Sequence, residues 1–121
     1  MRRALTALAI TAAVLFASAP PAMAGTLSVK GASGELNLWG GRLTVTDTAC
    51  DDDSVYANWR TDFGETIKLK NEIGCGFYKL EDLPLPPGKQ TDVIWRVCVD
   101  KSWPTGDLCS GWKRETVYNP S

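Results

Sequence analysis

Acidic side chains are the groups in this sequence whose spacing comes nearest to a catalytic pattern. Asp62 and Glu65 lie close together in an expected turn, and Glu81 adjoins Asp82 ahead of a proline-rich stretch. A glycosidase needs two carboxyl groups roughly 5 to 9 Å apart, so either pair has residue types suited to glycoside hydrolysis. We interpret both pairs as solvated turn residues, and we expect no catalytic residues.

The sequence contains no histidine. This excludes Ser-His-Asp and Cys-His machinery and a histidine acid or base. We therefore expect the protein not to be an enzyme.

A run of aspartates could offer oxygen ligands to calcium. Asp51, Asp52 and Asp53 follow closely after Asp47, and calcium takes six to eight oxygens. The run lacks the alternating spacing of a loop that wraps an ion. We interpret it as an Asp-rich turn and expect no metal and no cofactor, while calcium binding by Asp51 to Asp53 stays an open alternative.

Five tryptophans are present, and tryptophan stacks on ligands and anchors interfaces. Trp59 and Trp95 fall on apolar strand faces and are expected in the core. Trp39 precedes two glycines, Trp103 lies at an expected hairpin tip, and Trp112 has charged neighbours. These last three are the candidate ligand-binding residues.

The four cysteines, Cys50, Cys75, Cys98 and Cys109, form an even set that predicts two disulfides in a short exported chain. Three pairings are possible. Pairing of sequence neighbours, Cys50 with Cys75 and Cys98 with Cys109, is favoured because each bond closes a local loop. Oxidised cysteines would supply no thiolate nucleophile. Their spacings do not match a zinc ligand set, and no histidine is present to complete one.

The first 24 residues have the pattern of an export signal. Arg2 and Arg3 precede an apolar stretch that is too short to span a bilayer, and Ala22-Met23-Ala24 forms a small-x-small cleavage site. We expect cleavage after Ala24, leaving one secreted domain over residues 25–121 with no membrane insertion. That product has 11 basic and 14 acidic residues, a net charge of −3, which argues against nucleic-acid binding.

The remaining sequence alternates between apolar and polar residues and shows no convincing helical period. Turn signals separate the segments, including residues 30–34 and the proline-rich stretch 83–88, and residues 118–121 are expected to be a frayed tail. About seven strands at this spacing predict an antiparallel β-sandwich, with a small β-barrel as the alternative. The expected strands are 26–30, 35–39, 42–47, 54–62, 66–70, 75–80, 91–100 and 108–117, with 91–100 in a central position.

Two segments resemble parts of a known sandwich family. Residues 85–99, LPPGKQTDVIWRVCV, resemble the proline-glycine turn and following strand of fibronectin type III or immunoglobulin-like domains. Residues 54–59, SVYANW, resemble the strand of those domains that carries a core tryptophan. The resemblance implies an immunoglobulin-like sandwich and carries no function with it.

The whole chain also resembles small secreted proteins of filamentous actinobacteria. The features in common are the cleavage site, the CDDDSVY segment at 50–56 and the RVCVD segment at 96–100. That group has no assigned activity, so this resemblance implies secretion and compactness.

We therefore expect a small secreted binding or interaction protein without catalytic activity. Its partner would be an extracellular protein or a glycan, and we expect a monomer. The first alternative is an inhibitor of a secreted hydrolase that uses an exposed rigid loop at 84–88 or 103–107. The second is a structural or surface-coat protein.

Overall fold

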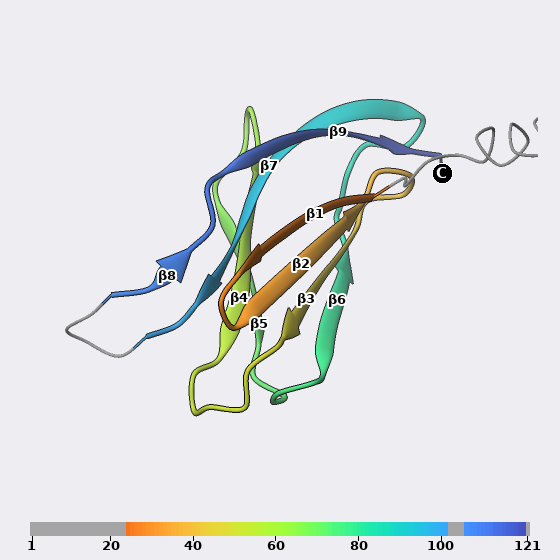
Figure 1. The fold of residues 1–121 in the computed structure, drawn as a ribbon. Helices are drawn as coiled ribbons and strands as arrows, with labels where there is room; N and C mark the ends of the chain where they lie inside the picture. Colours follow the sequence, from red (N-terminus) through yellow and green to blue (C-terminus); the bar gives the residue numbers. More distant parts are fainter. Residues whose placement is uncertain (1–23, 102–105, 121) are drawn as a thin grey trace, which may run out of the picture.

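The computed structural model describes residues 24–101 and 106–120. Every regular element in these residues is a β-strand (Figure 1). The strands are β1 (Ala24–Val29), β2 (Ala32–Asn37), β3 (Arg42–Asp47), β4 (Val55–Thr61), β5 (Ile67–Asn71), β6 (Tyr78–Asp82), β7 (Lys89–Val99), β8 (Leu108–Cys109) and β9 (Lys113–Asn119).

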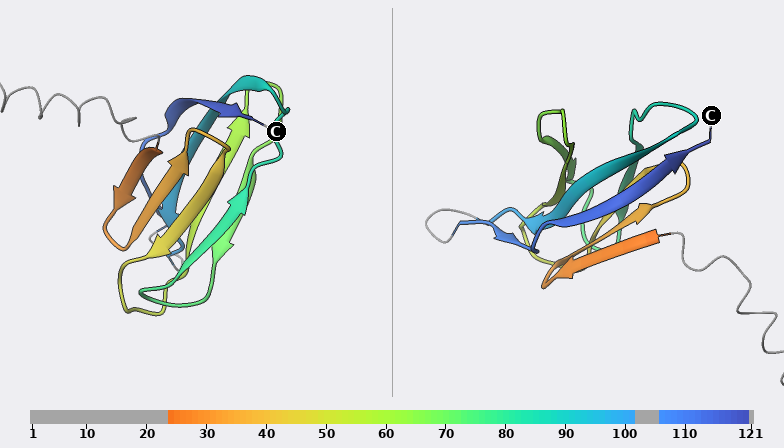
Figure 2. Two further views of the ribbon diagram at one scale, coloured as in Figure 1. Left: turned by 90° about the vertical axis from the view of Figure 1, so that its right-hand side faces the viewer. Right: turned by 90° about the horizontal axis from the view of Figure 1, so that it is seen from above.

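Two antiparallel sheets face each other. Sheet A has the order β1-β2-β3-β6, and sheet B has the order β5-β4-β7, with β8 and β9 both pairing with β7 beyond it. Seen from two further directions, the sheets form two layers (Figure 2). The expected all-β antiparallel sandwich is confirmed, and the barrel alternative is wrong. The expectation of about seven strands was low, because the described residues contain nine.

The core lies between the sheets and is built from alternate residues of the longest strands. Val93, Trp95, Val97 and Val99 of β7 are fully buried, as Val55 and Ala57 of β4 are. Sheet A contributes Leu36, Leu43 and Val45. Because β7 lies between β4 and the β8–β9 edge, its expected central position is confirmed.

Both favoured disulfides are present. Cys50 bonds Cys75, joining the loop after β3 to the loop before β6, and Cys98 bonds Cys109 across the β7–β8 pair. Two disulfides in so small a chain indicate an oxidising, extracellular type of environment. No helix in the described residues is long and apolar enough to cross a membrane.

Several strand boundaries differ from the expected ones. The first hairpin turns at Lys30 and Gly31, so β2 already begins at Ala32 rather than after residue 34. The strand expected at 75–80 is shifted to Tyr78–Asp82, since residues 74–77 form a turn beside the first disulfide.

The expected final strand, 108–117, is interrupted at residues 110–112. Ser110 Oγ accepts the N–H of Val97 at 3.1 Å, in the place of a backbone acceptor, and Gly111 and Trp112 leave the ladder. The expectation of a frayed tail from residue 118 was wrong for Tyr118 and Asn119. Tyr118 donates its N–H to the carbonyl of Leu38 at 2.9 Å, and Asn119 accepts from Gly88 N–H at 2.6 Å.

Candidate functional site

Strands β7 and β9 present a polar ladder on the face of sheet B that points away from the core. Their register sets Gln90 opposite Tyr118 and Asp92 opposite Thr116. Arg114 follows on the same side of β9, because directly opposed residues share a face and every second residue returns to it. The neighbouring residues on the other face, Val93 and Val117, are fully buried. The core therefore holds this row in place.

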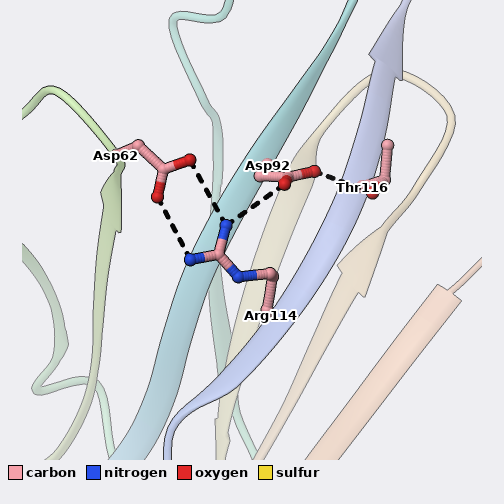
Figure 3. Close-up of polar contacts among 4 residues, drawn as sticks. All are labelled: Asp62, Asp92, Arg114 and Thr116. Carbon is pink, nitrogen blue, oxygen red and sulfur yellow. Dashed lines mark hydrogen bonds and ion pairs between the residues drawn. The ribbon is translucent and has the colours of Figure 1, made fainter.

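Arg114 lies between two carboxylates (Figure 3). It donates to Asp62, at the end of β4, through Nη1 at 3.3 Å and Nη2 at 3.2 Å. It also donates to Asp92 through Nη1 at 3.1 Å. Asp92 in turn accepts from the Thr116 hydroxyl at 2.8 Å. The three strands β4, β7 and β9 thus contribute to one charged row.

The charge state of this row is fixed by its hydrogen bonds. The Thr116 hydroxyl, and after it the Arg114 guanidinium, lower the pKa of Asp92 against the opposing effect of desolvation. Hydrogen bonding to Asp62 and the charge of that carboxylate raise the pKa of Arg114. Asp92 is therefore a carboxylate and Arg114 a cation at neutral pH, and Asp92 is not poised to act as a general acid.

A groove of about 730 Å³ opens beside this row. The β4–β5 hairpin forms one wall and the proline-rich connection from β6 to β7 forms another, and both lie at the upper end of the molecule in Figure 1. Phe63, at the hairpin tip, is 100% exposed. The lining residues include Trp59, Thr61, Asp62, Phe63, Gly64, Glu65, Ile67, Pro84, Leu85, Pro86, Gln90, Thr91, Asp92 and Thr116.

A second hollow of about 470 Å³ adjoins the groove, because Gln90 and Thr116 line both. Its aromatic wall is Trp39, which is 53% exposed and packs on Tyr118 with ring centroids 4.9 Å apart. Asn37 Oδ1 accepts the N–H of Trp39 at 2.9 Å. The backbone on either side of Trp39 is tied to Tyr118, as Leu38 accepts from Tyr118 and Gly40 donates to it. The indole is thus exposed and positioned at the same time.

The other tryptophans lie elsewhere or outside the description. Trp59 and Trp95 are buried as expected. Trp112 is 45% exposed and stacks on Arg96, whose guanidinium carbon lies 4.5 Å from the ring centroid. Trp103 lies outside the described residues. Trp39 and Trp112 lie toward opposite ends of β7. Trp39 packs on Tyr118, which is opposite Gln90, whereas Trp112 packs on Arg96, six residues further along the strand.

Several of the acidic residues singled out for catalysis or calcium have protein partners. Asp62 bonds Arg114 as above, and Asp82 bonds Arg42 Nε at 2.8 Å. In the Asp-rich turn, Asp51 accepts the N–H of Asp53, and Asp53 pairs with Lys101 at 3.1 Å. No group of three acidic or sulfur ligands suited to a metal occurs among the described residues.

The sequence did not single out six residues that line these two hollows or form the polar row between them. They are Phe63, Gln90, Asp92, Arg114, Thr116 and Tyr118. The alternation within residues 91–100 extends back to Gln90 and puts it on the same face as Asp92, which was a usable signal. Arg114 joins that row only through the register of β9 with β7. That register could not be predicted from the sequence, because the strand is interrupted at residues 110–112.

Comparison of the chain with models of protein families, with curated proteins and with solved structures finds no match. The geometry of the chain itself is therefore the basis for a functional proposal.

Proposed function

We propose that this protein is an exported, non-catalytic binding protein whose ligand is a carbohydrate. We call the site the Trp39–Phe63 surface, defined by Trp39, Tyr118, Gln90, Thr116, Asp92, Arg114, Asp62 and Phe63. One observation carries the proposal. Two adjoining hollows share Gln90 and Thr116, and each has an exposed aromatic side chain beside the row of fixed charges.

The chemistry of a sugar chain fits such a surface. A pyranose ring has an apolar face of C–H groups that packs on an aromatic ring, and hydroxyls around its edge that donate and accept hydrogen bonds. Trp39 offers the ring face. Asp92 and Asp62 retain acceptor capacity beyond their bonds to Arg114, and the Gln90 side-chain amide both donates and accepts.

Exposed aromatic side chains alone would fit many ligands, and the polar row narrows the choice. Charged side chains that are already bonded to each other keep a fixed orientation, so a ligand hydroxyl meets a preorganised partner. With Arg114 between two carboxylates, the row carries a net charge of −1, which disfavours an anionic ligand and leaves a neutral polyol as a suitable one.

We also propose that residues 1–24 are an export signal removed after Ala24, as the sequence pattern indicates. The disulfides support an oxidising destination. After cleavage at that position, β1 would still pair with β2 from Gly25, opposite Leu36, to Val29, opposite Ala32. A relation to fibronectin type III or immunoglobulin-like sandwiches belongs to the same proposal. The strand order β5-β4-β7-β9 and the position of Trp59 on β4 support it.

The test is a titration of the purified protein with cell-wall and plant polysaccharides, followed by tryptophan fluorescence. We expect at least one polysaccharide to shift the emission, and Trp39→Ala to weaken binding by about tenfold or more. Trp112→Ala is the matched control, since Trp112 is exposed to a similar degree but packs on Arg96 and lines neither hollow. Failure of every glycan to bind, or equal loss in the two variants, would overturn the proposal.

A second candidate, an inhibitor of a secreted hydrolase, is favoured by the full exposure of Phe63 next to the proline wall of the groove. A large apolar side chain at a hairpin tip is suited to filling a pocket of another protein. In a panel of proteases and glycosidases, this candidate predicts stoichiometric inhibition of one enzyme that Phe63→Asp removes. Phe77→Asp, at another exposed phenylalanine, should leave the inhibition intact.

A further inference from the structure

Strand β6 is an open edge of sheet A, independent of the Trp39–Phe63 surface. It pairs with β3 on one side only, and Figure 1 shows it as the last strand of its sheet. All five of its residues are exposed, including Leu80 at 41% and Tyr78. An exposed strand edge with apolar side chains is a template for pairing with another strand.

Two hydrogen bonds fix which backbone groups of β6 point outward. Leu83 N–H donates to Gly41 at 3.0 Å, and Phe77 accepts from Asp47 N–H at 3.2 Å. In an antiparallel ladder these groups alternate, so the odd-numbered residues of β6 bond to β3. The N–H and C=O groups of Tyr78, Leu80 and Asp82 therefore point away from the sheet and are available to a new strand.

We propose that β6 pairs antiparallel with β6 of a second copy of this chain, with the two-fold axis at Leu80. In that register the two Leu80 residues exchange N–H···O=C bonds, and Tyr78 of each copy bonds with Asp82 of the other. These are the outward-pointing groups, so the parity of the ladder is satisfied. The two sheets A become one continuous sheet.

Charge complementarity selects this register. It sets Lys79 of each copy opposite Glu81 of the other, giving two opposed pairs of unlike charge. Shifting the axis to Lys79 would oppose two ammonium groups, and shifting it to Glu81 would oppose two carboxylates. Like charges directly opposite each other destabilise a sheet.

Lys79 and Glu81 share a face with the buried Val45 and Leu43, through their register with β3. Inward-facing charges of this kind generally discourage pairing with another strand. Here they allow β6 to pair with a second β6 in the register that sets Lys79 opposite Glu81.

Strand β5, at the edge of sheet B, has no such charge complementarity with a second copy of itself. β5, the outer strand of sheet B, carries Lys68 and Lys70. Lysines at an edge strand protect it from pairing. The charge complementarity of β6 with itself therefore makes a second β6 the occupant of this edge. Because the interface is small, the dimer should form at high concentration and dissociate on dilution. This departs from the expectation of a monomer.

Sedimentation equilibrium of the purified protein, with its disulfides intact, tests the proposal. We expect the wild-type protein to be mainly dimeric at about 1 mM. Lys79→Glu alone opposes carboxylates at both pairs and Glu81→Lys alone opposes ammonium groups, so each should weaken self-association by about tenfold or more. An equimolar mixture of the two variants should associate as a heterodimer, because every pair is then of unlike charge.

The double variant Lys79→Glu/Glu81→Lys should self-associate like the wild-type protein. Leu80→Pro removes an outward N–H that β3 does not use, so it should abolish the dimer and leave the circular dichroism spectrum unchanged. A wild-type protein that remains monomeric at about 1 mM would overturn the proposal. So would single charge variants that associate as well as the wild-type protein, or a mixture that does not recover association.

Discussion

Asn71, at the end of β5, is a fully buried polar residue that ties the two sheets together. Its Nδ2 donates to the carbonyl oxygens of Val45, in sheet A, at 3.1 Å and of Phe77 at 3.0 Å. Its Oδ1 accepts the N–H of Ile73 at 2.9 Å. Replacing Asn71 with alanine removes all three hydrogen bonds.

The expected cost of Asn71→Ala follows from what the freed groups retain. Phe77 O also accepts from Asp47 N–H, and Ile73 is exposed to water, so the full penalty of an orphaned buried group does not apply. At about 1 kcal/mol for each bond, the free energy of unfolding should fall by about 3 kcal/mol. For a domain of this size the melting temperature should fall by about 12 to 24 °C.

Urea unfolding of the oxidised protein measures this change, with Asn58→Ala as the matched control. Asn58 is also buried, but within residues 24–101 and 106–120 its side chain accepts one hydrogen bond, from Arg96 at 3.0 Å, on the outer face of sheet B. Asn58→Ala should lower the free energy of unfolding by about 1 kcal/mol. Equal stabilities of the two variants would refute the assignment of Asn71 as a tie between the sheets.

Asn71→Asp adds a dependence on pH to the same test. The new carboxyl faces two carbonyl oxygens in a buried position, so its folded-state pKa should rise above the unfolded value of about 4. The neutral form then favours folding. The variant should be least destabilised below about pH 4 and should lose stability as the pH rises through the folded-state pKa.

Three further changes test other parts of the fold. Gly34→Ala should cost about 1 to 3 kcal/mol in urea unfolding, because an added Cβ would lie 2.4 Å from Val97 in the facing sheet. The Tyr56 hydroxyl donates to Asp107 and lowers the pKa of that carboxyl; Tyr56→Phe should therefore lose stability at pH 7 and show a smaller difference from wild type as the pH falls below about 4. Replacing both cysteines of the β7–β8 disulfide with alanine should cost about 3 kcal/mol, since the bridged residues are 11 apart in sequence, and an unchanged melting temperature would contradict this.

The fold class was predictable because its signals are local. The alternation within β7 and β4 reports which residues face the core, and the cysteine spacing favoured the pairing that occurs. The strand boundaries were harder to predict wherever a contact between distant parts of the chain determines where a strand ends. Tyr118 stays in its strand because Leu38 accepts its N–H from the far end of the chain, which local propensity does not report.

The candidate site was predictable only in part for the same reason. Trp39 was identified from its residue type and its position before two glycines. The salt bridge of Arg114 with Asp62 joins residues 52 apart in sequence, so neither residue alone indicates it. Phe63 was treated as part of a turn, and its complete exposure depends on how the hairpin tip projects from sheet B.

The most direct test of the proposed carbohydrate surface is a ¹H–¹⁵N NMR titration of the protein with the polysaccharides or their oligosaccharides. A bound glycan should shift the indole N–H signal of Trp39 and the amide signals of Gln90, Thr116 and Arg114, while the indole signal of Trp112 stays in place. Absence of any shift with every glycan, or shifts centred on Trp112, would contradict the account.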